Sequence, residues 1–115
     1  MRVLVCGGRD FSDWSLLKKI LDECHIENGI TLIIEGGARG ADYLAKQWAV
    51  EHDIIWEEYR ADWDKYGKRA GLLRNKRMIE LGKPHLVIAF PGGKGTKDML
   101  QQAQEANIET WEIIY

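Results

Sequence analysis

The chain has little cysteine, and its usual metal-ligand types are scattered. Only Cys6 and Cys24 occur among the 115 residues, and they lack C-x-x-C spacing, so neither a disulfide framework nor a zinc site is expected. His25, His52 and His85 show no ligand spacing with the cysteines or with one another. We therefore expect no metal and no resident cofactor, and two small buried thiols in a reducing compartment.

Long apolar runs and a strong net charge are also absent. No run approaches the roughly 20 apolar residues that span a bilayer, and the apolar start of the chain is far too short for a signal peptide. The 16 basic and 18 acidic side chains leave a net charge of -2, which provides no overall field for nucleic acid or an anionic membrane. We expect a cytoplasmic protein without a membrane partner, and nucleic acid is not the expected partner.

The sequence instead alternates apolar runs with amphipathic stretches. Continuous apolar runs predict buried strands, and apolar residues recurring every three or four positions predict helices. We expect strands at 2–6, 31–35, 54–59, 86–90 and 109–115, and helices at 13–25 with Ser12 as cap, from 41, at 67–81 and after 96. Residues 60–66 are expected to form a loop. This pattern predicts one α/β domain over residues 1–115, a doubly wound, Rossmann-like, five-stranded parallel sheet of order 3-2-1-4-5 with helices on both faces.

Three glycine-rich turns follow three of the predicted strands. They are Gly7-Gly8, Gly36-Gly37 with Gly40 close behind, and Pro91-Gly92-Gly93-Lys94-Gly95-Thr96. Because parallel strands end at the same edge of a sheet, we expect the turns to converge on one crevice. Bare backbone N–H groups and the positive end of a helix dipole can hold a phosphate there, and the Thr96 hydroxyl can add a contact. A tight turn with glycine only for its dihedral angles is the alternative for any single one of them.

Common nucleotide motifs are missing. Gly95 separates Lys94 from Thr96, so Walker A spacing is absent, and Gly7-Gly8 opens no G-x-G-x-x-G fingerprint. A GTPase or a nicotinamide dehydrogenase is therefore not supported. No serine or cysteine stands in a recognisable nucleophile motif.

Charged residues stand in or beside the expected crevice. Arg9, Arg39 and Arg74 have guanidinium groups suited to phosphate or carboxylate, and solvated surface arginines are the alternative. Asp42 begins the second helix, where it favours the helix dipole or contacts a ribose hydroxyl. Glu35 directly precedes the second turn. It is a candidate acid at the floor of the crevice, and a surface carboxylate at the end of a strand is the alternative.

The third helix has an unusual face. Gly67, Gly71, Arg74, Asn75 and Met78 fall on neighbouring positions by their spacing. Each glycine costs a helix about 1 kcal/mol relative to alanine, so two of them on one face indicate a close approach.

Basic and aromatic residues are interleaved around the same helix. This pattern binds single-stranded nucleic acid in some proteins, although a solvated helix face is its more common meaning, and an aromatic ring stacked on a bound base is a third interpretation. The residues are Trp63, Lys65, Tyr66, Lys68, Arg69, Lys76 and Arg77.

Four motifs in order resemble the SLOG superfamily, and most closely its small YspA-like branch, found in bacteria and their phages. The resemblance covers nearly the whole chain and implies a Rossmann-like nucleotide-binding domain, without settling an activity. The motifs are Gly7-Gly8-Arg9-Asp10, the stretch 35–42, Arg74-Asn75-x-x-Met78 and the stretch 91–96.

Lonely Guy enzymes of that superfamily cleave the N-glycosidic bond of nucleoside 5′-monophosphates with an arginine from an R-x-x-x-M helix and a glutamate from P-G-G-x-G-T-x-x-E. Arg74 and Met78 match the first pattern, but Met99 stands where the glutamate is expected, and Asp98 comes one residue early. One residue rotates a helical side chain by about 100 degrees. If the chain is an enzyme, the catalytic candidates are therefore Arg74 with Glu35, Asp42 or Asp98.

Three hypotheses follow. The leading one is a sensor or carrier that binds a small nucleotide-like ligand through Gly7, Gly8, Arg9, Gly36, Gly37, Arg39, Gly40, Asp42, Arg74, Asn75 and residues 91–96. The second is a divergent N-glycosidase on a nucleoside 5′-monophosphate. The third is single-stranded nucleic-acid binding, against which the acidic net charge counts. A homo-oligomer is left open.

Overall fold

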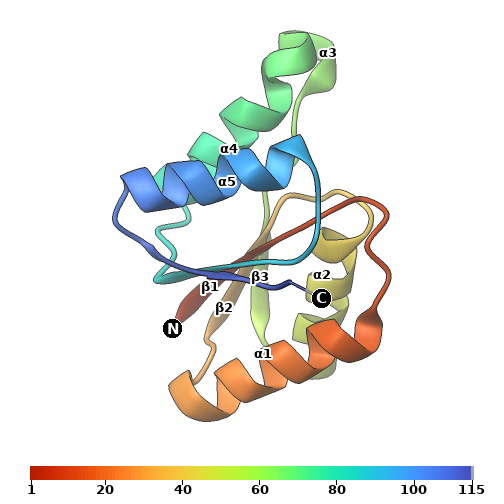
Figure 1. Ribbon diagram of the computed structural model, residues 1–115, viewed down its shortest axis with the longest axis vertical. Helices are drawn as coiled ribbons and strands as arrows, with labels where there is room; N and C mark the ends of the chain where they lie inside the picture. The colour runs from red at the N-terminus through yellow and green to blue at the C-terminus, as the bar shows by residue number, and fades with distance from the viewer. Residues whose placement is uncertain (115) are drawn as a thin grey trace.

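Five parallel strands form one sheet, in the order β3-β2-β1-β4-β5 (Figure 1). The computed structural model describes residues 1–114, so the expected end of the last strand at Tyr115 lies outside the described residues. The predicted fold class, strand order and parallel pairing are confirmed. The strands are β1 (Arg2–Cys6), β2 (Leu32–Glu35), β3 (Ile55–Glu58), β4 (Leu86–Ala89) and β5 (Glu109–Glu112).

Helices cover both faces of the sheet, as predicted. One core cluster packs α1 and α2 against Val3, Val5 and Ile33, and a second packs α4 and α5 against Leu4 and Ile34. Within residues 1–114, none of the helices has the length and apolarity to cross a membrane. The helices are α1 (Trp14–Asn28), α2 (Ala41–Glu51), α3 (Trp63–Tyr66), α4 (Ala70–Glu80) and α5 (Lys94–Glu105), with a 3₁₀ turn, η1 (Gly67–Arg69), before α4.

Burial differs between the central and edge strands. β2 and β4 are buried along their whole length, and β1 from its second residue, because helices cover both of their faces. The edge strands β3 and β5 are largely exposed or half-buried. This explains why the continuous apolar runs were the easiest strands to locate from the sequence.

Several helix starts differ from the expectation, and α5 begins at Lys94, inside the expected turn at 91–96. Asp13, not Ser12, caps α1, because its Oδ1 accepts from Leu16 N at 3.1 Å. The expected loop at 60–66 contains the single turn α3, capped by Asp62, whose carboxylate accepts from Lys65 N at 3.1 Å. Gly67 therefore lies before α4, with a φ of 56°, and not on the face shared by Arg74 and Asn75. An exposed single turn has no apolar period, which is why the sequence did not predict it.

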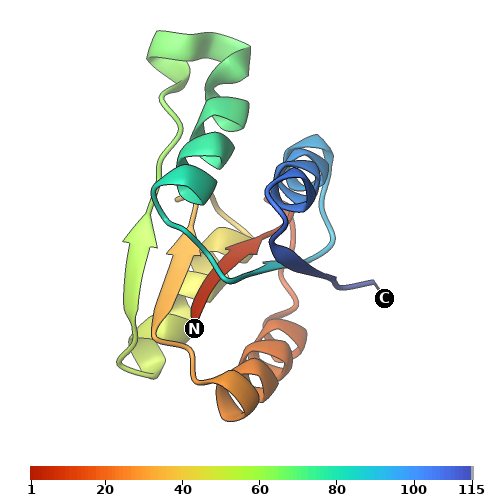
Figure 2. The same cartoon turned by 90° about the vertical axis from the view of Figure 1, so that its left-hand side faces the viewer.

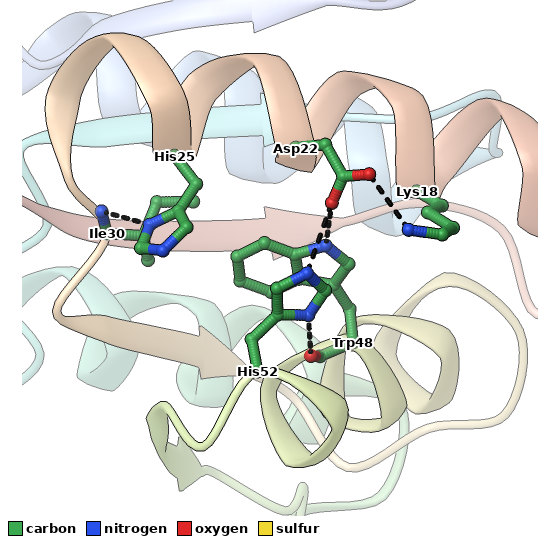
Figure 3. A network of polar contacts seen from close by, with 6 residues as sticks. All are labelled: Lys18, Asp22, His25, Ile30, Trp48 and His52. Atoms are coloured by element: carbon green, nitrogen blue, oxygen red, sulfur yellow. Dashed lines mark hydrogen bonds and ion pairs between the residues drawn. The ribbon is translucent and has the colours of Figure 1, made fainter.

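A polar network joins α1 to α2 (Figure 3). The Asp22 carboxylate accepts from Trp48 Nε1 at 2.9 Å and from Lys18 Nζ at 2.9 Å, and His52 Nε2 lies 3.3 Å away. The His52 ring stacks on Trp48 with centroids 4.2 Å apart. Asp22 thus gives the indole N–H of a fully buried tryptophan its partner.

Candidate functional site

The three glycine-rich turns meet at the carboxyl-terminal edge of the sheet. Gly8 N donates to the Pro91 carbonyl oxygen at 2.9 Å, and Ala41 N donates to the Gly8 carbonyl oxygen at 3.2 Å. The turn after β1 is therefore held between the turn after β4 and the start of α2. A side chain on Gly40 would collide with the carbonyl oxygens of Gly8 and Arg9, so its absence permits this contact.

A cavity of about 320 Å³ opens between these turns and α4. Its size falls in the usual range of small-molecule sites, about 300–1,000 Å³. Nine of the predicted ligand-binding residues line it: Gly7, Gly8, Arg9, Asp42, Arg74, Asn75, Gly93, Gly95 and Thr96. Trp63, which the sequence analysis named as an aromatic ring for stacking on a bound base, also lines it, and Cys6, Ala38, Gly71 and Met78, which the ligand-binding prediction did not include, complete the lining.

The remaining predicted residues lie around this cavity. Gly36, Gly37 and Arg39 line an adjoining hollow of about 380 Å³ that shares Arg9, Ala38, Trp63 and Arg74 with it. Pro91 and Gly92 line a hollow on the other side, toward α1, and Lys94 faces a groove beside β5. Gly40 is used in packing against the first turn. Arg39 is exposed and paired with Asp10 at 3.1 Å.

The amino-terminal end of α5 faces the cavity without a side-chain cap. Its N-cap is Gly93, no acidic residue stands in the first turn, and the backbone N–H groups at a helix start have no partner within the helix. A Cβ on Gly93 or Gly95 would meet no atom within 4 Å, so packing does not demand glycine there. Gly92 differs, since its Cβ would lie 2.6 Å from Gly8 N. Gly93 and Gly95 thus leave bare backbone open to an anion.

Arg74 reaches from α4 to the second turn. Its Nη1 donates to the Gly36 carbonyl oxygen at 2.6 Å, and its Nε donates to Asn75 Oδ1 at 3.1 Å. Burial lowers the pKa of the Arg74 guanidinium, and the nearby Asp42 carboxylate opposes that shift. An arginine stays protonated despite such a shift, so the cavity keeps a partly desolvated cation.

Asp42 lines the cavity from the start of α2 and is only 7% exposed. Its Oδ2 accepts from Ala38 N at 3.2 Å. Burial raises the pKa of the Asp42 carboxyl to about 6, against the hydrogen bond from Ala38 and the positive charge of Arg74. This side chain is a hydrogen-bond acceptor placed beside the cationic part of the cavity.

The other two carboxylates predicted as catalytic candidates do not line the cavity. Asp98 Oδ2 accepts from Asn75 Nδ2 at 3.0 Å and from Gln102 Nε2 at 2.8 Å, and the side chain borders a groove between α4 and α5. Glu35 is 1% exposed, beneath the second turn, where one oxygen accepts from Gly37 N. Among the three carboxylates, the structure brings only Asp42 to the cavity.

Trp63 closes one side of the cavity. The Arg9 guanidinium lies 5.3 Å from its ring centroid, and Trp63 is 47% exposed. The glycine spacing on the third helix predicted a close approach, and Trp63 is the group that approaches Gly71. In the described chain, residues 1–114, no three His, Cys, Asp or Glu side chains cluster as a metal site would require.

Comparison with known proteins agrees with the motifs. The sequence model of the YspA, cpYpsA-related SLOG family matches residues 1–66. The chain is also similar to the Gene 61 protein of Mycobacterium phage D29, with 38% identity over 115 residues, 93% of this chain and 91% of that protein.

Proposed function

Because the chain belongs to the YspA, cpYpsA-related SLOG family, we propose that it binds a nucleotide or nucleotide-derived ligand at the carboxyl-terminal edge of its sheet, as a sensor or carrier. The observation that carries this proposal is the cavity in which the uncapped start of α5, the cation of Arg74 and the acceptor Asp42 come together. This combination suits a ligand with an anionic group and hydroxyl groups.

We assign the parts of the ligand by chemistry. The phosphate lies at the start of α5, at Gly93, Gly95 and Thr96, where backbone donors and the helix dipole favour negative charge. A ribose hydroxyl donates to Asp42. The exposed face of Trp63 offers a stacking surface for the base.

A thermal-shift screen with nucleoside monophosphates, cyclic nucleotides and ADP-ribose tests the proposal, because a ligand that binds only the folded form raises the melting temperature. Two variants at one position sharpen it. Gly95→Ala and Gly95→Asp both fit sterically, since a Cβ there meets nothing within 4 Å. Both should fold at least as well as the original, but only Gly95→Asp places a negative charge at the phosphate position and should abolish binding. Binding that survives Gly95→Asp contradicts the assignment.

A second candidate function is the N-glycosidase. It is favoured by one observation, the half-buried Arg74 and the carboxylate of Asp42 lining the same cavity. A carboxylate there can activate water or stabilise an oxocarbenium-like transition state. Chromatography of nucleoside monophosphates incubated with the protein decides the question. Release of free base that is lost in Asp42→Asn and in Arg74→Ala establishes turnover, whereas binding without release leaves the sensor or carrier.

A further inference from the structure

Glu35 is a buried acid with one oxygen that lacks a donor. Its Oε1 accepts from Gly37 N, but Oε2 is sealed from solvent and has no hydrogen-bond partner among residues 1–114. A buried ionised carboxylate without a partner is strongly unfavourable. The position therefore indicates either a neutral carboxyl group or a further partner on a neighbouring element.

Glu58 is the neighbouring group on the adjacent strand. Glu35 and Glu58 are register neighbours on the adjacent strands β2 and β3, so their side chains leave the sheet on the same face. A Cβ on Gly37 would lie 3.4 Å from the Glu58 carboxyl carbon, which places that carboxyl against the same turn. A second carboxylate beside a buried one disfavours its ionisation, so this arrangement favours a proton retained by the pair.

The surroundings decide which residue holds the proton. Glu58 accepts from Arg60 Nε at 2.7 Å and lies 3.6 Å from Lys46 Nζ, and the hydrogen bond from Arg60 lowers the pKa of its carboxyl. Burial first, then the neighbouring Glu58, raises the pKa of Glu35 to about 8. Glu35 is thus the donor and Glu58 the charged acceptor.

Three further charged groups act on Glu35: Asp42, Arg74 and Arg60. Asp42 from α2 adds negative charge and favours the neutral form of Glu35. Arg74 from α4 adds positive charge and favours the ionised form, as Arg60 does from the loop after β3. Burial and the negative charges of Glu58 and Asp42 have the larger effect, because the pKa of Glu35 is raised despite the two arginines.

The pair is connected to the cavity through two residues. Glu35 holds the N–H of Gly37, whose φ of 73° defines the turn, and the carbonyl oxygen of Gly36 in that turn accepts from Arg74. The sole hydrogen bonds from Arg74 to other residues recorded in the described chain are those to Gly36 and to Asn75. A movement of the turn therefore displaces the guanidinium.

We propose that Glu35 and Glu58 share one proton, and that this carboxyl pair is a positioning element: it fixes the Gly36–Gly37 turn and, through Gly36, the Arg74 guanidinium in the cavity. Loss of the proton leaves two adjacent negative charges, which separate the end of β2 from β3 and release Arg74. The consequence for ligand affinity rests on the proposed nucleotide-binding function, whereas the shared proton does not.

Nuclear magnetic resonance of the free protein tests the pair without a ligand. The side-chain carboxyl carbon of Glu35 should titrate near pH 8, and the side-chain nitrogen resonances of Arg74 should shift in the same step. Titration of Glu35 at the ordinary glutamate value, or an Arg74 side chain that does not respond, overturns the proposal.

Adenosine 5′-monophosphate is the binding probe, since its phosphate titrates near pH 6 and is fully charged above that. Affinity of the original protein should fall about tenfold from pH 7 to pH 9, the scale of one weakened charge-assisted hydrogen bond. Glu35→Gln places a permanent donor toward Glu58 and should make the profile flat. Glu57→Gln removes a charge from the opposite face of β3 and should behave like the original protein.

The outcomes separate the two proposals. A Glu35→Gln profile that falls as steeply as that of the original protein overturns the positioning role. Absence of binding to any nucleotide in the screen counts against the proposed function, while the resonance titration still decides whether the carboxyl pair exists.

Discussion

The ring of Trp63 lies against Gly71, the second residue of α4: a Cβ on Gly71 would stand 3.3 Å from Trp63 Cη2. The glycine thus makes room for an aromatic ring that also borders the cavity. The same contact links the single turn α3 to α4 and keeps Trp63 beside Arg9.

Substitutions at Gly71 should separate helix propensity from ring packing. Gly71→Ala gains up to about 1 kcal/mol of helix propensity, and the half-exposed Trp63 can yield by a few tenths of an ångström, so stability to urea should be unchanged or higher. Gly71→Leu should displace the ring and change the Trp63 fluorescence. Loss of more than about 1 kcal/mol in Gly71→Ala would mean that the ring cannot move.

Gly36 is confined between two side chains of the site. A Cβ there would lie 2.5 Å from Arg74 Nη1 and 2.9 Å from Asp42 Oδ2. Because the end of the arginine is flexible, Gly36→Ala should fold with a cost of about 1–2 kcal/mol but expel the guanidinium. Calorimetry with a nucleotide identified in the screen should then show the affinity loss of Arg74→Ala. Gly93→Ala is the matched control for stability, not for affinity: a Cβ there meets nothing within 4 Å, so this variant should unfold at the same urea concentration as the original protein.

The contribution of Asp42 and Glu35 to stability should decrease as the pH rises. The raised pKa values of Asp42, to about 6, and of Glu35, to about 8, mean that the folded state holds these protons more tightly than the unfolded chain does. Their stabilising effect is complete below the ordinary carboxyl values and is lost as pH rises through 6 and then 8. Urea unfolding at a series of pH values measures this slope, at most about 1.4 kcal/mol per pH unit for one group. Glu35→Gln should remove the part between pH 6 and 8, and an unchanged slope there would contradict the assignment.

Asp22 should matter for stability and not for the ligand site. Asp22→Ala leaves the N–H of buried Trp48 without its partner and should cost about 1–3 kcal/mol. Lys18→Ala removes only an exposed neighbour of the same carboxylate and should cost less than about 1 kcal/mol. Equal losses in the two variants, measured by urea unfolding, would show that the indole hydrogen bond is not the important one.

The sequence predicted the elements that leave a regular trace. Apolar runs located the buried strands, and glycines directly after them located turns that do meet at one edge. Side-chain direction was harder to predict. Whether Asp98 faces the cavity depends on one residue of helix phase and on its hydrogen bonds with Asn75 and Gln102, and the pairing of Glu35 with Glu58 depends on the β2–β3 register. Neither leaves a pattern along a single strand or helix.

The segment of residues 60–77, which begins after β3 and runs through α3 into α4, extends beyond the edge of the sheet (Figures 1 and 2). It holds seven basic and two acidic side chains, although the whole chain has a net charge of -2. Positive charge is therefore concentrated in one part of the molecule. This uneven distribution should determine its binding to a charged resin more than the net charge does. An ion-exchange resin of either sign should retain it at low salt, each by a different end of the molecule.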